Sequence, residues 1–524
     1  MQSQPWTPTK DGLNRKGSLL SWLDERIRIL LLAPAFLVML LVFLYPILYT
    51  VYLSVHDWTL FTMQDPPFIG FKHILEVLSD TTFHRSLLRS AIYVCAGVGL
   101  QLVLGFTLAL AVDRIRRGQG LLTTLFVFPM MVTPVVVGLM WKFIFDYNFG
   151  IFNYTLTLFG LEKMAVLNTS STALAALIFV DTWQWTPFMF IVLLAGLRSL
   201  PTEPFEAADI DGASAWQKLR NITLPLLKSV MIVCLVMRAA GAIKVFDQIY
   251  VLTGGGPGTS TETFSILLHR KAFAEFNFGY SSALAIVLAI IVGIICWFAV
   301  RSLYSEKQGA TIMRSNRNHP LLYVYVYGAL VIFLFPIFWV MFTSIKTPTQ
   351  AFQIPPVWFF SPSLENYREV FRTQPFSEYL INSLITTVVS TLLALVIGTL
   401  AGYSLARFRI KGQRVITFSV FFTKILPPIV LVEPFFVLFQ QLGSTDSLFS
   451  LIVSYTTFNL PFVIWLMWGF LKELPESLEE AAIIDGTTRF GAMVAGCAAA
   501  CQARTSRIRH LHRHELLERI SVCA

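Results

Sequence analysis

Two polar loops contain the residues through which this chain could do chemistry. The first polar loop, from Leu200, begins LPTEPFEAADIDG, and the second polar loop, from Leu474, begins LPESLEEAAIIDG. Each has carboxylates near the start of a predicted helix and an Asp-Gly pair at its end. We expect these residues to recognise a partner through charge and shape, and we predict no catalytic residue in the chain.

The first polar loop is expected to fold as two short helices that meet at an angle. Pro204 suits a first helical turn, where a missing N–H costs nothing, and Glu206 places negative charge at the positive end of the helix dipole. Gly212 is the residue type favoured just past a helix end. Ser214 then starts the second helix, with Gln217 three residues later, which is the spacing of a capping box.

The second polar loop repeats the first. Leu200-Pro201, Glu206-Ala207-Ala208 and Asp211-Gly212 return with the same spacing as Leu474-Pro475, Glu480-Ala481-Ala482 and Asp485-Gly486. A duplicated amphipathic helix lying at a membrane surface is the simpler interpretation. A composite pattern repeated within one chain argues for a specific role.

The longer pattern resembles a known family. Glu206-Ala207-Ala208, three residues, Gly212, nine residues, Ile222, one residue and Leu224-Pro225 resemble the EAA loop of ABC importer permeases. In that family the loop is the cytoplasmic coupling helix that docks on the ATPase subunit. The resemblance, which covers the chain from about Ile27 to Phe490, implies ATPase-docking residues in both loops. They are Glu206, Ala207, Ala208, Asp211, Gly212, Glu480, Ala481, Ala482, Asp485 and Gly486.

The composition is that of an integral membrane protein. Hydrophobic residues make up 55% of the chain, charged residues make up 14%, and the mean hydropathy is +0.65. The formal net charge of +9 does not indicate binding of nucleic acid, because the basic residues lie in short loops between apolar runs. We predict an all-α membrane protein: a polytopic transmembrane helix bundle in the lipid bilayer, similar to a type I ABC importer permease.

Ten apolar runs are long enough to cross a bilayer, which takes about 20 residues. Six lie at 29–53, 90–112, 121–145, 173–199, 227–252 and 280–303, and four at 321–345, 380–406, 415–441 and 447–471. With a cytoplasmic N-terminus, the basic clusters at 114–117 and 407–414 and both polar loops fall on the cytoplasmic side. We therefore expect a multi-pass protein of the cell (inner or plasma) membrane without a cleavable signal peptide.

The predicted organisation has five segments. They are a cytoplasmic N-terminal segment (1–26), a first permease half with six spans (27–303, polar loop 200–226), a linker (304–320), a second half with four spans (321–491, polar loop 474–491) and a tail (492–524). Polar composition and Pro320 suit a linker. Arg117-Gly118-Gln119 matches Lys411-Gly412-Gln413 after the second span of each half, so the chain looks like a fused pair of maltose-type permeases.

Two further patterns suggest chemistry that the chain is not expected to have. The run 254–259, GGGPGT, resembles a phosphate loop but lacks its Gly-Lys-Ser/Thr ending, and no Walker A motif occurs. His510, His512 and His514 lie in an Arg-rich tail without a carboxylate cluster, so no metal site is predicted. The six cysteines imply no disulfide framework. We expect no cofactor on this chain.

One apolar run carries polar residues at membrane depth. The segment FVDTWQWTPF contains Asp181, Trp183, Gln184 and Trp185, and an ionisable residue inside a span is by default a functional-site hypothesis. Tryptophan faces beside amide and hydroxyl groups suit the mixed C–H and O–H surface of a sugar. An aromatic belt at the outer interface is the alternative. The equivalent span of the second half adds Thr456 and Asn459 as candidate pathway residues.

The resemblance implies a permease component of a binding-protein-dependent ABC importer for a sugar, polyol or related small solute. Its implied partners are an extracytoplasmic solute-binding protein and two ABC ATPase subunits, which would hold ATP and magnesium. A secondary transporter with two similar halves is the main alternative. The paired polar loops and the scarcity of carboxylates within the spans favour the ABC class.

The tail fits a shifted reading frame. After Gly486 the family pattern requires nine residues, then Ile-x-Leu-Pro and two more spans, whereas this chain continues from Met493 as MVAGCAAACQARTSRIRHLHRHELLERISVCA. Read one nucleotide later, the codons from Met493 permit Trp-Ser-Arg-Val-Ala-Leu-Pro, which restores the spacing, and then an apolar run. We infer one extra nucleotide near Ala492–Met493, or an equivalent loss of two. An inactive, frameshifted permease is therefore a third interpretation.

Overall fold

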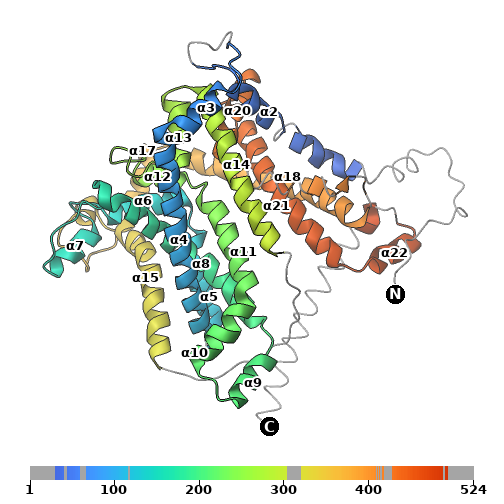
Figure 1. The fold of residues 1–524 in the computed structure, drawn as a ribbon. Helices are drawn as coiled ribbons and strands as arrows, with labels where there is room; N and C mark the ends of the chain where they lie inside the picture. Colours follow the sequence, from blue (N-terminus) through green and yellow to red (C-terminus); the bar gives the residue numbers. More distant parts are fainter. Residues whose placement is uncertain are drawn as a thin grey trace, which may run out of the picture. The chain divides into compact units, whose positions relative to one another are not determined.

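The computed structural model describes residues 30–40, 44–59, 66–115, 118–303, 320–408, 410, 412–413, 416–417, 420, 428–487 and 490–493. Within these residues the regular structure is helical, and the only pairing of extended segments is two isolated β-bridges. In the described part of the chain, six helices are long and apolar enough to cross a membrane, or seven if one bent pair counts as a span. The predicted all-α membrane fold is confirmed (Figure 1), while the total of ten spans stays a prediction.

The chain divides into two compact units. One unit comprises Ile47–Ile381 with Ile425–Leu438, and the other comprises Met1–Pro46, Asn382–Lys424 and Phe439–Ala524. Each unit therefore takes segments from both predicted halves. The predicted domain boundaries follow the sequence and stay a prediction. The N-terminal segment 1–26, nearly all of the linker 304–320 and the tail beyond Met493 lie outside the described residues.

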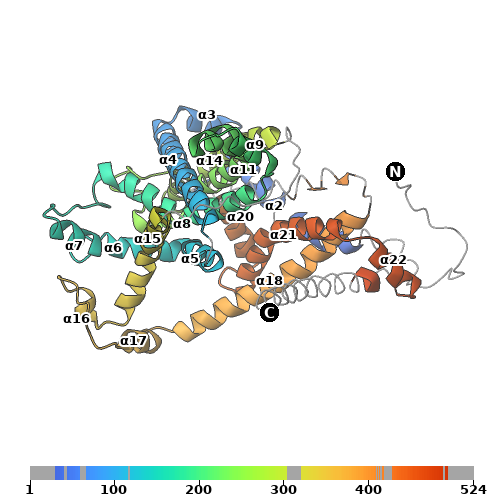
Figure 2. The ribbon, with the colours of Figure 1, turned by 90° about the horizontal axis from the view of Figure 1, so that it is seen from below.

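The larger unit is built on two long helices, α4 (Thr81–Asp113) and α8 (Ser170–Arg198), which lie side by side (Figure 1, Figure 2). A small residue lets them approach closely: a Cβ on Gly105 would lie 2.6 Å from Met189 Cβ and 2.9 Å from the backbone N of Phe190. Helices in a bilayer gain most of their association from such close packing, because lipid is as apolar as their own side chains. A third helix, α11 (Leu224–Ala242), packs against both.

Two of the predicted spans are broken in the structure. The run 121–145 forms α5 (Gln119–Met131) and α6 (Pro134–Ile144), bent by 89° relative to each other. Thr133 before Pro134 is extended, as the residue before a proline prefers, and this separates the two helices. The run 227–252 likewise ends at Ala242 and resumes as α12 (Asp247–Leu252), across a segment that contains the polar Lys244. The sequence did not predict these interruptions of the two runs.

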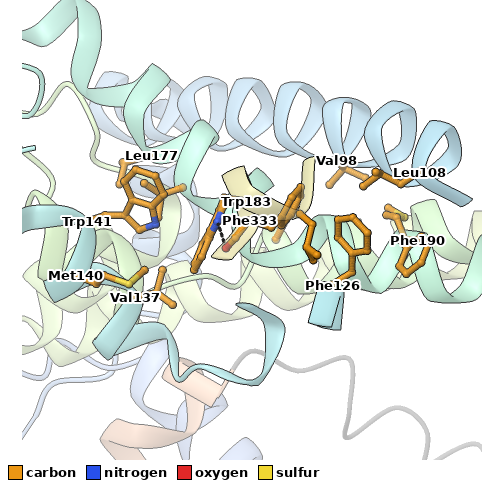
Figure 3. Packing of buried hydrophobic residues seen from close by; sticks show 14 of the residues in the cluster. Val98, Leu108, Phe126, Val137, Met140, Trp141, Leu177, Trp183, Phe190 and Phe333 are labelled. Carbon is orange, nitrogen blue, oxygen red and sulfur yellow. Dashed lines mark hydrogen bonds between the residues drawn. The ribbon is translucent and has the colours of Figure 1, made fainter. Parts of the chain in front are cut away.

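Each predicted half contributes its first helix to the unit that consists mainly of the other half. Helix α15 (Pro320–Ser344) packs on α4, α5 and α6 in the larger unit, where Trp183 Nε1 donates to Phe333 O at 3.1 Å (Figure 3). The helix Leu30–Met39 belongs to the other unit, where its Ala35 is buried with Leu405 and Ile464. The two sequence halves are therefore interleaved in the packing of both units.

The remaining helices connect these elements. In the larger unit they are α2 (Tyr45–Ser54), α3 (Lys72–Ser79), α7 (Ile151–Leu158), α13 (Phe264–His269), the π-helix η3 (Arg270–Ala274), α14 (Phe278–Leu303), α16 (Pro348–Ala351) and α17 (Glu365–Thr373). Helices α18 (Phe376–Arg407), α20 (Pro428–Gln441) and α21 (Leu448–Glu473) follow. Gly118 and Gly412 have φ of 79° and 78°. Gln119 and Gln413, which follow them, both donate to the carbonyl of the preceding helix end, at 3.0 and 2.7 Å, so the repeated turn closes alike in each half.

Candidate functional sites

The first polar loop begins with helix α9 (Glu203–Ile210). Pro204 lies in its first turn together with Glu203 and Glu206, as the sequence predicted. The helix ends at Asp211, and Gly212 adopts a left-handed φ of 71°. The Ala213 N–H then donates to Ala208 O at 2.9 Å, which closes the helix end. The predicted Asp-Gly stop is confirmed.

The predicted capping box starts the second helix of this loop, α10 (Ala215–Lys218). The Gln217 N–H donates to Ser214 Oγ at 3.3 Å, and the Ser214 N–H donates to Gln217 Oε1 at 2.7 Å. A π-helical turn, η2 (Leu219–Thr223), leads directly into α11. The loop is therefore continuous with a helix of the core. Because no irregular segment separates α10 from α11, a movement of the loop would be transmitted directly to α11.

The second polar loop has the same local geometry. Helix α22 (Ser477–Ile484) ends at Asp485, Gly486 has a φ of 87°, and the Thr487 N–H donates to Ala482 O at 3.1 Å. Glu479 fixes this loop to α18 through an ion pair with Arg407 at 2.7 Å and a hydrogen bond from Tyr403 at 2.8 Å.

Both loops present acidic and apolar side chains to the outside. Glu206, Asp211, Glu480 and Asp485 are exposed, as are Ala207 and Ala481, while Ala208 and Ala482 are half-buried. The equivalent Ile210 and Ile484 are 88% and 84% exposed. An exposed isoleucine beside carboxylates on a short helix offers a protein partner both an apolar and a charged contact.

A cavity of about 600 Å³ lies where the two broken spans meet α8 and α13 in the larger unit. Its lining residues are Pro134, Gln184, Trp185, Gly241, Lys244, Val245, Phe246, Asp247, Gln248, His269, Phe273 and Val432. The breaks before α6 and after α11 thus turn loop backbone and polar side chains toward one space, which a pair of unbroken helices would have filled. Irregular backbone at membrane depth is tolerated where it lines such a cavity.

Two amide side chains of this cavity lining each have one atom without a hydrogen-bond partner among the described residues. Gln184 donates from Nε2 to Val132 O at 2.9 Å, but within the described part of the chain its Oε1 has no partner. Gln248 Nε2 also has none among the described residues. Both residues are 1% exposed. A buried amide atom without a partner is costly, so this acceptor and this donor mark Gln184 and Gln248 as candidate ligand-binding residues.

The candidate pathway residues separate into three groups. Gln184 and Trp185 line the cavity. Asp181 and Trp183 are buried residues of α8 outside the cavity lining: Asp181 pairs with Arg238, and Trp183 packs on Trp141 with ring centroids 5.6 Å apart (Figure 3). Thr456 and Asn459 lie on α21 of the other unit. There Thr456 is buried, and Asn459 is exposed and donates to Tyr455 O at 2.9 Å.

Sequence reasoning missed Arg238, Gln101 and Gln248. Arg238 could have been noticed, because it is a lone arginine in the apolar run LVMRAAGA and such residues are rare and functional. Gln101 and Gln248 carry a weaker sequence signal, since their side chains are uncharged. Their significance comes from burial and from the groups that face them.

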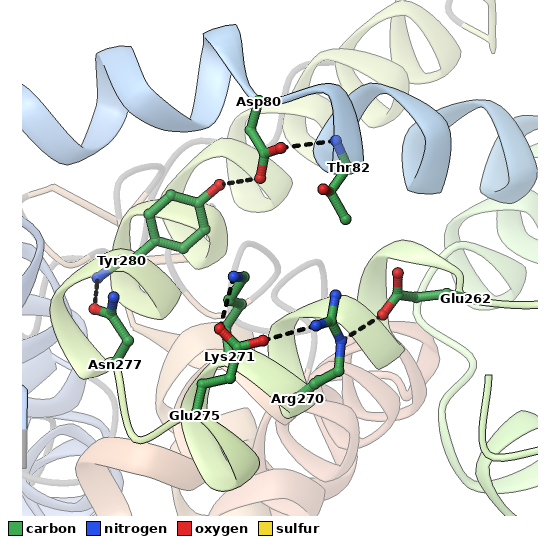
Figure 4. A network of polar contacts seen from close by, with 8 residues as sticks. All are labelled: Asp80, Thr82, Glu262, Arg270, Lys271, Glu275, Asn277 and Tyr280. Atoms are coloured by element: carbon green, nitrogen blue, oxygen red, sulfur yellow. Dashed lines mark hydrogen bonds and ion pairs between the residues drawn. The ribbon is translucent and has the colours of Figure 1, made fainter. Parts of the chain in front are cut away.

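A polar network ties the start of α4 to α13, η3 and α14 (Figure 4). Arg270 pairs with the buried Glu262 and with Glu275, both at 2.7 Å, and Tyr280 donates to Asp80 at 2.7 Å. Burial raises the pKa of the Asp80 carboxyl, but hydrogen bonds from Tyr280 and Thr82 outweigh burial and bring that pKa below its ordinary value. The predicted turn 254–259 lies just before this network, between α12 and α13.

A family profile matches both halves of the chain. The family is described as "Binding-protein-dependent transport system inner membrane component", and the matched residues are 101–308 and 394–495. These segments include both polar loops, the cavity residues from Pro134 to Phe273, and Arg238. The match therefore covers both polar loops and most of the cavity lining.

The chain is also similar to individual transport proteins. The chain is 36% identical over 282 residues to the trehalose/maltose transport system permease protein MalF of Thermococcus litoralis, covering 53% of this chain and 94% of that protein. It is 33% identical over 288 residues to the trehalose transport system permease protein SugA of Mycobacterium tuberculosis, covering 55% and 91%. A solved bacterial alginate ABC transporter is also similar, at 22% identity and a TM-score of 0.47, covering 56% of this chain and 99% of that one.

Proposed function

This chain belongs to the family of binding-protein-dependent transport system inner membrane components, and from that premise we propose that it is the permease of an ATP-driven importer for a sugar-class solute. The names of the relatives support a carbohydrate, since they refer to transport of trehalose and maltose. The permease carries the solute across the inner membrane and is not itself an enzyme. ATP and magnesium belong to the partner ATPase.

The observation that carries the substrate class is the chemistry of the cavity. Gln184 Oε1 is an acceptor and Gln248 Nε2 a donor without a partner among the described residues, and the hydroxyl groups of a sugar can both donate and accept. Trp185, Phe246 and Phe273 add flat apolar faces suited to the C–H surface of a sugar ring. A neutral, hydroxyl-rich solute fits this lining better than an inorganic ion does.

The coupling sites follow from the two polar loops. We assign Glu206, Ala207, Ala208, Asp211 and Gly212, with Glu480, Ala481, Ala482, Asp485 and Gly486, to docking on two ATPase subunits. Their exposure beside Ile210 and Ile484 supports a contact surface. Continuity of the first loop with α11, which carries cavity-lining Gly241, gives a route from docking to solute. The N-terminus and both loops are then cytoplasmic, and a solute-binding protein delivers solute from the other side.

Uptake by cells that express the complete importer tests this function. Radiolabelled trehalose and maltose are the probes, and the variants are Gln248→Ala and Trp185→Ala, with Gln374→Ala as the control at the exposed end of α17. Each orphaned hydrogen bond is worth about 1–3 kcal/mol, so Gln248→Ala should lower uptake by about tenfold while membrane levels stay unchanged. Normal uptake by both cavity variants would reject this cavity as the solute site.

The energy source separates the ABC importer from a secondary transporter. An importer driven by a partner ATPase continues to transport when a protonophore collapses the proton gradient, provided that cellular ATP is maintained. Loss of uptake at constant ATP would favour the ion-driven alternative, which the family membership disfavours.

A further inference from the structure

Three buried polar side chains from three helices form a closed ring behind the cavity. Arg238 of α11 donates through Nη2 to both carboxylate oxygens of Asp181 on α8, at 2.5 Å each. Its Nε donates to Gln101 Oε1 on α4 at 2.9 Å, and Gln101 Nε2 donates to Asp181 Oδ2 at 2.8 Å. Their exposed fractions are 4%, 0% and 0%. The ring therefore holds the three helices of the core together away from solvent.

The ring also contacts the wall of the cavity. The guanidinium carbon of Arg238 lies 4.8 Å from the centroid of the Trp185 indole, within the range of a cation–π contact. A Cβ on Gly241 would lie 3.4 Å from Arg238 Nη1. Trp185 and Gly241 both line the cavity. The Arg238 guanidinium thus hydrogen-bonds at its edge to the Asp181 carboxylate and the Gln101 amide. Two lining residues of the cavity, Trp185 and Gly241, lie against it.

Packing of the three helices does not by itself require charged residues at these positions. An ion pair at membrane depth loses its hydration, and apolar residues of similar volume would often stabilise a buried site as well or better. A planar guanidinium, however, is held at its edge by hydrogen bonds while its face stacks on an aromatic ring, which neither lysine nor leucine can do. The arrangement is suited to fixing the indole in one orientation.

We propose that Arg238 is a positioning residue for the cavity: clamped by Asp181 and Gln101, it fixes the Trp185 indole in the orientation that receives the solute. Because Asp181 cancels the charge of Arg238, the wall behind the indole presents no net charge, in keeping with a neutral solute. The inference rests on the proposed function, since it takes the cavity as the solute site. It gives Asp181 a role through Arg238 in place of direct contact with solute.

The chain contains a matched control. Arg198 pairs with Asp113 at 3.4 Å and donates to Gln119 Oε1 at 3.1 Å, so the same three residue types again join α8 to the end of α4 and to α5. The Arg198 and Asp113 side chains are 40% and 31% exposed and are not among the cavity-lining residues. Arg198→Lys therefore repeats the chemical change of Arg238→Lys without touching the solute site.

A double-mutant cycle between Arg238 and Trp185 tests the proposal. Initial uptake of radiolabelled trehalose (or maltose, if the parent imports it faster) is measured in cells carrying the complete importer. The variants are Arg238→Lys, Trp185→Ala, their combination and Arg198→Lys. Membrane levels and co-purification with the ATPase are measured in parallel. Arg238→Lys should lower uptake about tenfold, yet by less than about twofold when Trp185 is already Ala, because the residue acts through the indole. Arg198→Lys should stay within about twofold of the parent.

Each other result overturns the proposal. A loss that is equally large in both backgrounds means that the ion pair acts elsewhere in the fold. If Arg238→Lys takes up solute normally while Trp185→Ala does not, Arg238 has no positioning role and the proposed function is unaffected. Normal uptake by Trp185→Ala removes the positioning role of Arg238, and only together with normal uptake by Gln248→Ala does it also reject the cavity as the solute site.

A second variant covers the case in which Arg238→Lys does not reach the membrane. Gln101→Met keeps the ion pair and removes one hydrogen bond from the guanidinium edge. Uptake should fall about threefold to tenfold, again only while Trp185 is present. An effect independent of Trp185, or no effect, contradicts the positioning role.

Discussion

At the scale of single residues, the polar loops combine a rigid backbone with exposed acids. Gly212 and Gly486 have φ of 71° and 87°, and a residue with a Cβ is strained there by about 1–2 kcal/mol. Nothing lies within 4 Å of the position that a Cβ would take on either glycine, so the requirement comes from the backbone alone. The turn therefore fixes how Glu206 and Glu480 are presented.

Glu206→Lys should weaken association with the ATPase while the chain still inserts. The change reverses an exposed charge in the first turn of α9, and close charge pairs across interfaces couple by about 1.5 kcal/mol or more. Co-purification with the ATPase should fall by about tenfold or more. Glu365→Lys makes the same change in the first turn of α17 and should leave association intact. Equal recovery of ATPase with both variants would contradict the docking assignment.

At the scale of elements, glycines set the distance between the paired helices in both units. Gly105 allows α4 to approach α8, and Gly398 allows α18 to approach α21, where a Cβ would lie 2.6 Å from Val463 Cγ1. These pairs precede the first and second polar loops respectively. The same contact thus recurs at equivalent places in the two halves.

Gly105→Ala should destabilise the α4–α8 pair. Forcing a methyl group into a filled contact costs about 1–3 kcal/mol, and both Met189 Cβ and the Phe190 backbone would have to move. The apparent melting temperature of the purified chain in detergent should fall by several degrees relative to the parent. Gly99→Ala on the same helix meets nothing within 4 Å and should melt like the parent. Indistinguishable melting of the two variants would show that the helices are not packed this closely.

At the scale of the whole molecule, the two predicted halves depend on each other. The α15 side chains Val326, Phe333 and Trp339 are buried in the unit that otherwise comes mainly from the first half. Without α15, the Trp183 N–H would lose its acceptor at Phe333 O. An unpaired donor and exposed apolar surface would remain on α8.

Splitting the chain tests this dependence. Residues 1–310 expressed alone should be recovered from membranes several-fold less than when residues 311–524 are co-expressed, and the two pieces should then co-purify. Trp183→Ala in the first piece should weaken co-purification, since it removes a hydrogen bond of about 1 kcal/mol together with the packing on α15. Trp216→Ala, an exposed position on α10, serves as the control. Recovery of 1–310 that is independent of its partner would count against the interleaved packing.

The sequence by itself determined the local structure of the polar loops. The Asp-Gly stop and the Ser214–Gln217 capping box were predicted and are confirmed, because caps and turns depend on residues within four positions of each other. Composition and apolar runs likewise predicted a helical membrane protein. The reading-frame interpretation of the tail stays a prediction that resequencing of codons 493–524 would check.

Tertiary structure alone decided where the buried polar groups meet. Asp181, Arg238 and Gln101 lie on three helices and are far apart in sequence, so neither periodicity nor motif spacing indicates their ring. The cavity arises from breaks in two spans that apolar composition presented as continuous. Packing decides these features because side chains at bilayer depth must find partners on other helices, and which helices become neighbours depends on the whole arrangement of each unit.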